Sequence, residues 1–120
     1  MPEAATVRDL TITPTEGGIT APKGFRSAAL HCGIKAKANA LDLTVIAVDT
    51  AASAAGLFTT NLAQAAPVLV SKQHLARTGG VARAIVVNSG CANACTGDQG
   101  MSDARRMASD VAAALACDPP

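Results

Sequence analysis

The C-terminal third of the sequence joins three patterns in a fixed order. Residues 82–87 are mostly apolar, which predicts a buried strand. The stretch VNSGCANACTGD at 87–98 carries two glycines and two asparagines, and it predicts a loop. Over about 98–117 apolar residues recur at helical spacing, which predicts an amphipathic helix closed by Pro119-Pro120. This order favours a fold in which helices pack on a sheet.

Four segments nearer the N-terminus predict further strands. They are the loosely alternating residues 7–13, two short candidates at 19–21 and 25–34, and residues 41–48. The first ends at Pro14 and suits a sheet edge, and turns are expected at 15–18 and 22–24, where glycine and proline are concentrated. The run at 41–48 is the clearest strand, because it alternates at its start and is apolar at its end. We expect one of its faces to be fully buried.

The middle of the chain mixes the signals of helix and strand. Residues 51–66 are rich in alanine but contain a glycine and the turn-like FTTN, so no element is assigned there. Residues 67–70 predict a strand, and Ser71 is expected to cap a short helix over 72–77. The Thr78-Gly79-Gly80 sequence then ends that helix, as glycine commonly does.

The predicted elements favour a layered α+β fold over a doubly wound α/β fold, because the strands come in hairpin-like clusters followed by helices. A length of 120 residues suits a single domain or a partial domain spanning 1–120. Phe25 and Phe58 are the only aromatic residues, so the interior must be built from aliphatic side chains in closely approaching elements. Few large side chains are left to anchor the fold in isolation.

Charge and hydropathy exclude several classes of protein. Ten basic and nine acidic residues are spread along the chain, so no basic patch indicates nucleic-acid binding. No apolar run approaches the roughly 18 residues that span a bilayer, and residues 1–8 lack the pattern of a secretory signal. A cytoplasmic protein is expected. The four cysteines, Cys32, Cys91, Cys95 and Cys117, are therefore expected to be reduced thiols.

The cysteines have three alternative roles. Cys91 and Cys95 are spaced C-x3-C. His31 and His74 could complete a zinc site with them, but these histidines are isolated singles rather than a close pair. Cys95 precedes the predicted helix, whose N-terminal dipole would favour the thiolate of a catalytic cysteine. We favour the third role, a small buried thiol packing where alanine would fit, and we predict no metal or cofactor.

The stretch 87–98 has a further physical interpretation. A strand, a glycine-bearing loop and a helix N-terminus together expose backbone N–H groups that can hold a carboxylate, a phosphate or a developing oxyanion. Asn88 and Asn93 would brace the loop through hydrogen bonds to the backbone, and Gly90 and Gly97 would supply turns. Both common glycine-rich nucleotide motifs are missing from the stretch, so no nucleotide site is predicted.

Other charged residues are expected to be solvated. Glu16, Asp42 and Asp49 fall in turns or at strand ends, far apart in the sequence. We interpret them as solvated carboxylates rather than as an acid–base set. Lys35 and Lys37 flank a strand end and predict a solvated face.

Four segments together resemble one known family. They are GGITAPKGFRSAALHCGIK at 17–35, DLTVIAVD at 42–49, AAGLFTTNLAQAAPV at 54–68 and ARAIVVNSGCANACTGDQGMSDARRM at 82–107. They are similar to the N-terminal part of the α chain of bifunctional glutamate N-acetyltransferase/ornithine acetyltransferase. The most specific piece is NSG-x-ANACTG followed by the helix. The resemblance implies the layered α/β/β/α-like sandwich of that family, with only its N-terminal portion present.

The resemblance also implies a two-step acyl transfer. Members of the family move an acetyl group from N2-acetylornithine to glutamate in arginine biosynthesis, and some also use acetyl-CoA. A precursor cleaves itself before a threonine, which becomes the N-terminal nucleophile of a β chain and forms an acetyl-threonine intermediate beside an oxyanion hole. The implied partners are this β chain, in an α2β2-type assembly, and the small substrates. No nucleic-acid or membrane partner is predicted.

The family's reacting groups have no counterpart in this sequence. The oxyanion segment, a lysine-bearing glycine motif, the cleavage site and the nucleophile are expected after the helix, and the sequence stops at Pro120. We therefore predict no catalytic residue and interpret the loop as support for the site. The supporting residues are Asn88, Ser89, Gly90, Asn93, Thr96 and Gly97. Two alternatives stay open: a self-processing N-terminal-nucleophile peptidase and a non-catalytic assembly module.

Overall fold

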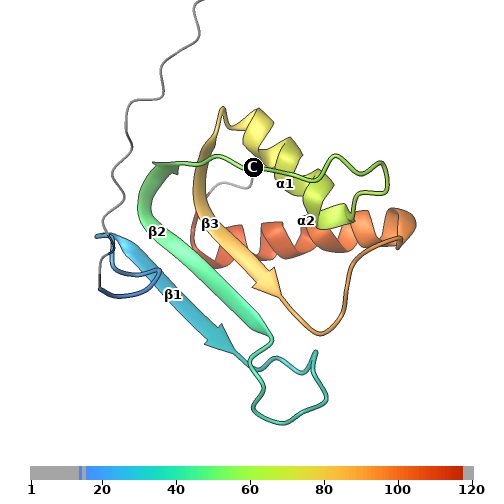
Figure 1. Ribbon diagram of the computed structural model, residues 1–120, viewed down its shortest axis with the longest axis horizontal. Coiled ribbons are helices and arrows are strands. Elements are labelled where there is room, and N and C mark those ends of the chain that lie inside the picture. The colour runs from blue at the N-terminus through green and yellow to red at the C-terminus, as the bar shows by residue number, and fades with distance from the viewer. Residues whose placement is uncertain (1–13, 15, 118–120) are drawn as a thin grey trace, which may run out of the picture.

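The structure is a computed structural model that describes residue 14 and residues 16–117. Its three strands form one antiparallel sheet in the order β1-β2-β3, with bounds Phe25–Leu30, Leu43–Ser53 and Val81–Asn88. Helix α1 (Ala66–Arg77) precedes β3, and helix α2 (Gly97–Ala114) follows it (Figure 1). The predicted α+β class is confirmed. The strand expected at 7–13 lies outside the described residues.

Three of the predicted strands are present, with different ends. β1 ends earlier than expected, β2 continues beyond the expected end at residue 48, and β3 matches the run at 82–87 closely. Residues 19–21 form a turn instead of a strand, in which the Ala21 N–H donates to the Gly18 carbonyl oxygen at 2.9 Å. A run of three residues between a glycine and a proline is too short to build a strand ladder.

Helix α1 replaces the strand predicted at 67–70. Pro67 lies in its first turn, where the missing N–H has no helical partner to lose. A short apolar run does not distinguish a strand from a helix by its period, which is why this prediction was wrong. Ser71 lies inside the helix and does not cap it. The end is as predicted, since Gly79 and Gly80 follow the last turn with φ values of 63° and 78°.

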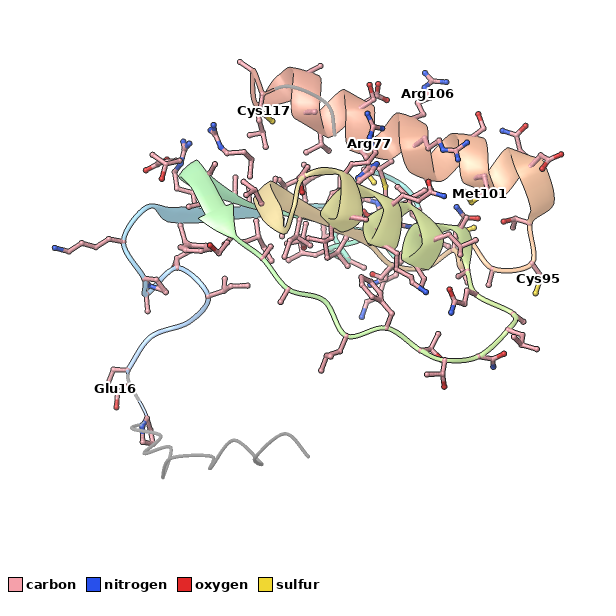
Figure 2. The ribbon with its side chains drawn as sticks, turned by 90° about the horizontal axis from the view of Figure 1, so that it is seen from above. Glu16, Arg77, Cys95, Met101, Arg106 and Cys117 are labelled. Carbon is pink, nitrogen blue, oxygen red and sulfur yellow. The ribbon has the colours of Figure 1, made fainter. Side chains whose placement is uncertain are left out.

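Helix α2 confirms the predicted amphipathic helix, although it ends at Ala114, before the prolines expected to close it. It packs beside α1 (Figure 2), where Ala66, Val70 and Ala104 are buried and Met101 packs against them. The helices therefore approach through small side chains, as the aromatic-poor composition predicts. Neither of these helices is long and apolar enough to cross a membrane.

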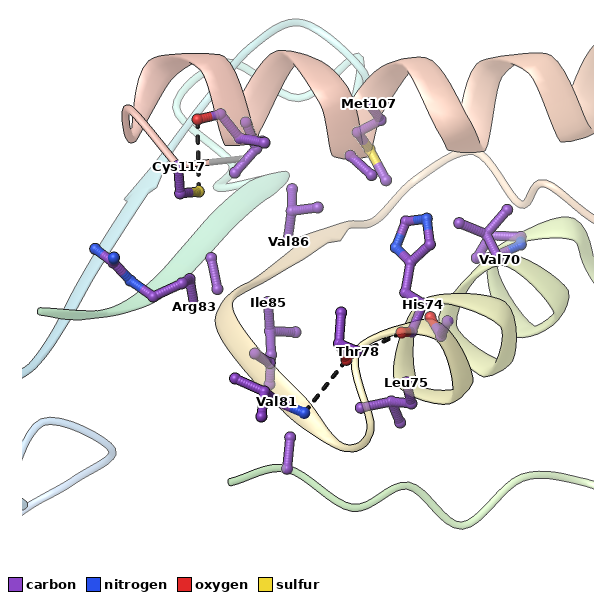
Figure 3. A pocket seen from close by; sticks show the side chains of 18 of the residues that line it. Val70, His74, Leu75, Thr78, Val81, Arg83, Ile85, Val86, Met107 and Cys117 are labelled. Atoms are coloured by element: carbon purple, nitrogen blue, oxygen red, sulfur yellow. Dashed lines mark hydrogen bonds between the residues drawn. The ribbon is translucent and has the colours of Figure 1, made fainter. Parts of the chain in front are cut away.

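The sheet has one face toward α2 and one open face. Val86 of β3 points toward α2 (Figure 3), so its neighbours Ile85 and Val87 point to the opposite side. Ile85 is 59% exposed and Val87 is 49% exposed, and Ile46 of β2 pairs with Ile85 on the same side. β3 is thus not the buried strand predicted. Nor is one face of β2 fully buried, since Ala47 is its one buried residue.

Residues 1–120 alone are expected to be marginally stable, because the described chain buries no large side chain completely and leaves an apolar sheet face open. We expect a broad melt by circular dichroism, together with binding of a hydrophobic dye that Ile85→Lys reduces. A cooperative melt of the monomer at high temperature would contradict this expectation.

Candidate functional site

One side-chain amide joins the loop 88–97 to the first turn of α2. Asn93 Nδ2 donates to the Gly100 carbonyl oxygen at 2.8 Å, and the Thr96 hydroxyl donates to Asn93 Oδ1. Both polar ends of the Asn93 amide are therefore used. Gly97 begins the helix with a φ of 61°, a left-handed conformation that favours glycine. The loop is thus tied to the helix that follows it.

Gly100 completes this joint and was not singled out from the sequence. It is buried, and a Cβ at this position would overlap Thr96 Oγ1 and Asn93 Oδ1. The available signal was a glycine in the first turn of a predicted helix, where alanine would be favoured by about 1 kcal/mol. A glycine at such a position is consistent with a close contact at its Cα, and the structure has one.

The sheet end of the same loop lies against loop 31–41, which joins β1 to β2. The Ser89 N–H donates to the main-chain carbonyl oxygen of Asp42 at 2.9 Å. Gly90 has a φ of 112°, and a Cβ there would lie 2.8 Å from Lys35 Cγ. Two loops from different parts of the sequence therefore meet at the start of the predicted site.

The six supporting residues predicted from the sequence divide between these two ends of the loop. Asn93, Thr96 and Gly97 lie at the α2 end. The other three lie at the sheet end and include Asn88, whose Nδ2 donates to the Cys91 carbonyl oxygen at the long distance of 3.5 Å. The supporting role of these residues stays a prediction.

Asp42 carries a buried carboxylate, contrary to the solvated role predicted for it. The side chain has no exposed surface, and Oδ1 accepts from the Cys32 N–H at 2.7 Å. Oδ2 accepts from the N–H groups of Ile34 at 2.9 Å and Lys35 at 3.0 Å. His31 Nδ1 lies 3.1 Å from the same oxygen. Main-chain donation, first from Cys32 and then from Lys35, holds the pKa of the Asp42 carboxyl well below its usual range.

The sequence did not reveal this role because the donors to Asp42 are main-chain groups, which no spacing of side chains indicates. Glu16 and Asp49 are exposed, as predicted, and Asp49 forms a surface ion pair. Lys37 is exposed, whereas Lys35 is half-buried and its ammonium donates to a main-chain oxygen at 2.9 Å. The solvated face predicted for the two lysines is therefore confirmed for one of them.

All four cysteines are free thiols, and Cys32, Cys91 and Cys95 are exposed, so the buried role is wrong for these three. Cys117 is half-buried, and its Sγ donates to a main-chain oxygen at 3.5 Å. A hydrogen bond with Asp42 raises the pKa of the Cys32 thiol, which opposes a nucleophilic role. The described part of the chain gathers no three metal-ligating side chains, so the zinc alternative has no geometric support there.

A cavity of about 530 Å³ lies between α1, α2 and β3 (Figure 3). Its lining is mostly apolar and includes His74 and Arg83. Burial, with the charges of Arg77 and Arg105, lowers the pKa of the His74 imidazole. Arg83 Nε donates to the Val48 carbonyl oxygen at 3.2 Å. We interpret the cavity as space between layers and place the candidate site at loop 88–97.

Known proteins resemble this chain over most of its length. The sequence profile of the ArgJ family matches residues 26–120. The arginine biosynthesis bifunctional protein ArgJ of Dehalococcoides mccartyi is 51% identical over 105 residues, which is 87% of this chain and 25% of that protein. The mitochondrial ArgJ protein of Postia placenta is 58% identical over 88 residues, or 72% of this chain and 19% of that protein. The chain thus spans about a quarter or less of these relatives.

Two crystal structures share the fold. The ArgJ protein of Bacillus halodurans has a TM-score of 0.81 at 39% identity, over 86% of this chain and 52% of that chain. Ornithine acetyltransferase of Mycobacterium tuberculosis, complexed with ornithine, has a TM-score of 0.74 at 49% identity, over 82% of this chain and 50% of that chain. The fold is therefore that of ArgJ structures. With the profile match over 26–120, these likenesses show that the chain belongs to the ArgJ family.

Proposed function

We propose that this chain is the N-terminal α-chain portion of an enzyme that transfers an acetyl group from N2-acetylornithine to glutamate in arginine biosynthesis. Membership of the ArgJ family carries the proposal, and the 49% identity to an ornithine acetyltransferase crystallised with ornithine supports it. The nucleophile is the N-terminal threonine of a partner β chain, which forms an acetyl-threonine intermediate. Acetyl-CoA is a second candidate donor of the acetyl group.

In this proposal the described residues support the reacting groups and do not react. The tetrahedral intermediate carries a negative charge, which is best stabilised by donors that are already in place before the reaction. Loop 88–97 backs the oxyanion segment, and its bonds to Gly100 at one end and to Asp42 at the other hold its shape. The six supporting residues named above therefore act by positioning the oxyanion segment.

The first test is denaturing intact-mass analysis of the complete enzyme. This term denotes the chain together with the further polypeptide that gives it the length of its relatives. A second polypeptide that begins with threonine, together with acetyl transfer from N2-acetylornithine to glutamate, supports the proposal. Hydrolysis of amide substrates without an amine acceptor would favour the peptidase alternative instead. A single polypeptide without either activity would favour the remaining alternative, a non-catalytic assembly module.

Replacing Cys95 with alanine is expected to leave acetyl transfer within about twofold of the wild-type rate, because the proposed nucleophile is a hydroxyl on another chain. Cys95 is exposed and has a φ of 56°, and alanine keeps the Cβ, so the backbone strain there is unchanged. Steady-state kinetics of the complete enzyme check this prediction. A total loss of transfer in a folded Cys95→Ala enzyme would revive the thiol nucleophile.

Three further features stay predictions. Residues 1–120 are proposed to form a single or partial domain, the assembly is proposed to be of the α2β2 type, and the location is proposed to be cytoplasmic. The name of the Postia placenta relative places that protein in mitochondria. Light scattering of the complete enzyme and cell fractionation check the assembly and the location.

A further inference from the structure

Loop 31–41 lies against the first residues of loop 88–97. The Ser89 N–H donates to the Asp42 carbonyl oxygen at 2.9 Å. At Gly90 a Cβ would lie 2.8 Å from Lys35 Cγ and 3.2 Å from Ile34 Cγ2, so the Gly90 backbone packs directly on these two residues. These contacts connect residues 34–35 directly to the start of loop 88–97.

The shape of loop 31–41 depends on one carboxylate. Asp42 accepts three main-chain N–H groups, and two of them belong to Ile34 and Lys35, the residues that contact Gly90. His31 Nδ1 lies between Asp42 Oδ2, at 3.1 Å, and the Ala40 carbonyl oxygen, at 2.9 Å. The buried carboxylate thus binds the first residues of the loop, and His31 links them to Ala40 near its other end.

We propose that Asp42 is a positioning residue of the acetyl-transfer site, whose carboxylate holds loop 31–41 against Ser89 and Gly90 and thereby sets the position of loop 88–97. The inference rests on the function proposed above. It assigns to Asp42 a role in the rate of the reaction as well as in folding. Small misplacements at a distance from the reacting atoms can lower a rate by about 10²-fold, because the donors no longer meet the transition state.

The discriminating variant is Asp42→Asn, which keeps the size of the side chain but replaces one acceptor oxygen with a donor group. It cannot accept from Cys32, Ile34 and Lys35 in the same arrangement. Asp49→Asn is the matched control, because Asp49 lies in β2, the strand that begins directly after Asp42, is exposed and forms an ion pair only with the surface residue Arg26 among the described residues. Both variants are prepared in the complete enzyme.

The measurement compares kcat and KM per folded molecule, well below the melting temperature, with hydrogen exchange of a peptide spanning 88–97. For Asp42→Asn we expect kcat to fall by about 10- to 100-fold, KM for N2-acetylornithine to stay within about twofold, and exchange in 88–97 to accelerate while α1 is unchanged. Asp49→Asn is expected to behave as wild type. If Asp42→Asn does not fold, His31→Ala is used, with a smaller loss of kcat in the same direction.

Unchanged kcat per folded molecule in Asp42→Asn, with only a lower melting temperature, would overturn the positioning role and leave a purely structural one. A fall in kcat or a rise in KM without any change of exchange in 88–97 would also overturn it, because the coupling between the two loops would be missing. If the wild-type enzyme transfers no acetyl group, the proposed function is wrong, and so is the positioning role that depends on it.

Discussion

Replacing Asp42 with alanine is expected to lower the melting temperature of the complete enzyme by roughly 5–10 °C. The change leaves the part-buried N–H groups of Cys32, Ile34 and Lys35 without the carboxylate that accepts from them. Asp49→Ala is the control, and because its ion pair is exposed to solvent we expect a shift of no more than about 2 °C. Equal shifts for both variants, measured by thermal circular dichroism, would contradict the special role of Asp42.

The effect of Asp42→Ala is expected to depend on pH. The pKa of Asp42 in the folded protein is lowered, so its contribution is fully present above the unfolded-state pKa of about 3.9 and is lost as the pH falls from there toward the folded-state pKa. Melts of wild type and Asp42→Ala should therefore converge below about pH 4 and keep a constant gap from pH 5 to pH 8. A gap that widens in acid would contradict this sign.

Gly100→Ala is expected to destabilise the complete enzyme by about 2 kcal/mol, although alanine is the better helix former. The gain in helix propensity is about 1 kcal/mol, whereas overpacking costs about 1–3 kcal/mol and each broken hydrogen bond about 1 kcal/mol more. The added methyl group would overlap Thr96 Oγ1 and Asn93 Oδ1, so the bonds that join the loop to α2 cannot persist. The free energy of unfolding in urea measures the outcome.

The matched control for Gly100→Ala is Ser109→Ala, at an exposed position of the same helix. Because no overlap occurs at an exposed position, the helix propensity of alanine is expected to raise stability there by a few tenths of a kcal/mol. If Gly100→Ala proved as stabilising as Ser109→Ala, the joint between Asn93 and α2 would not be the tight contact described here.

The sequence predicted best where a pattern extends over many residues. The amphipathic period over 98–117 predicted α2 because eighteen helical residues sample the 3.6-residue repeat several times. The short apolar run at 67–70 was assigned to the wrong element, because four residues fit either period and Pro67 suits the first turn of a helix. The open face of β3 was missed for another reason. Burial depends on which segment packs on a strand, and the apolar residues of the strand do not indicate that.

The sequence indicated which loop to consider as the candidate site, but not the contacts that hold that loop in the structure. Loop 88–97 stood out by composition, and the bonds of Asn93 match the side-chain bracing that composition predicts. Asp42 was missed because its partners are main-chain N–H groups. Gly100 was missed because its role depends on the lack of a Cβ atom. The local sequence around an aspartate at a strand end does not reveal whether its carboxylate is solvated or accepts from three N–H groups.

The open face of the sheet has a consequence for biosynthesis. In a longer protein made from its N-terminus, these three strands and two helices leave the ribosome before the rest of the chain, with Ile85 and Val87 exposed. At 5–20 residues per second, completing a protein about four times as long takes on the order of tens of seconds. During that interval the nascent chain would expose these apolar side chains to other chains, and exposed apolar surface of this kind favours aggregation.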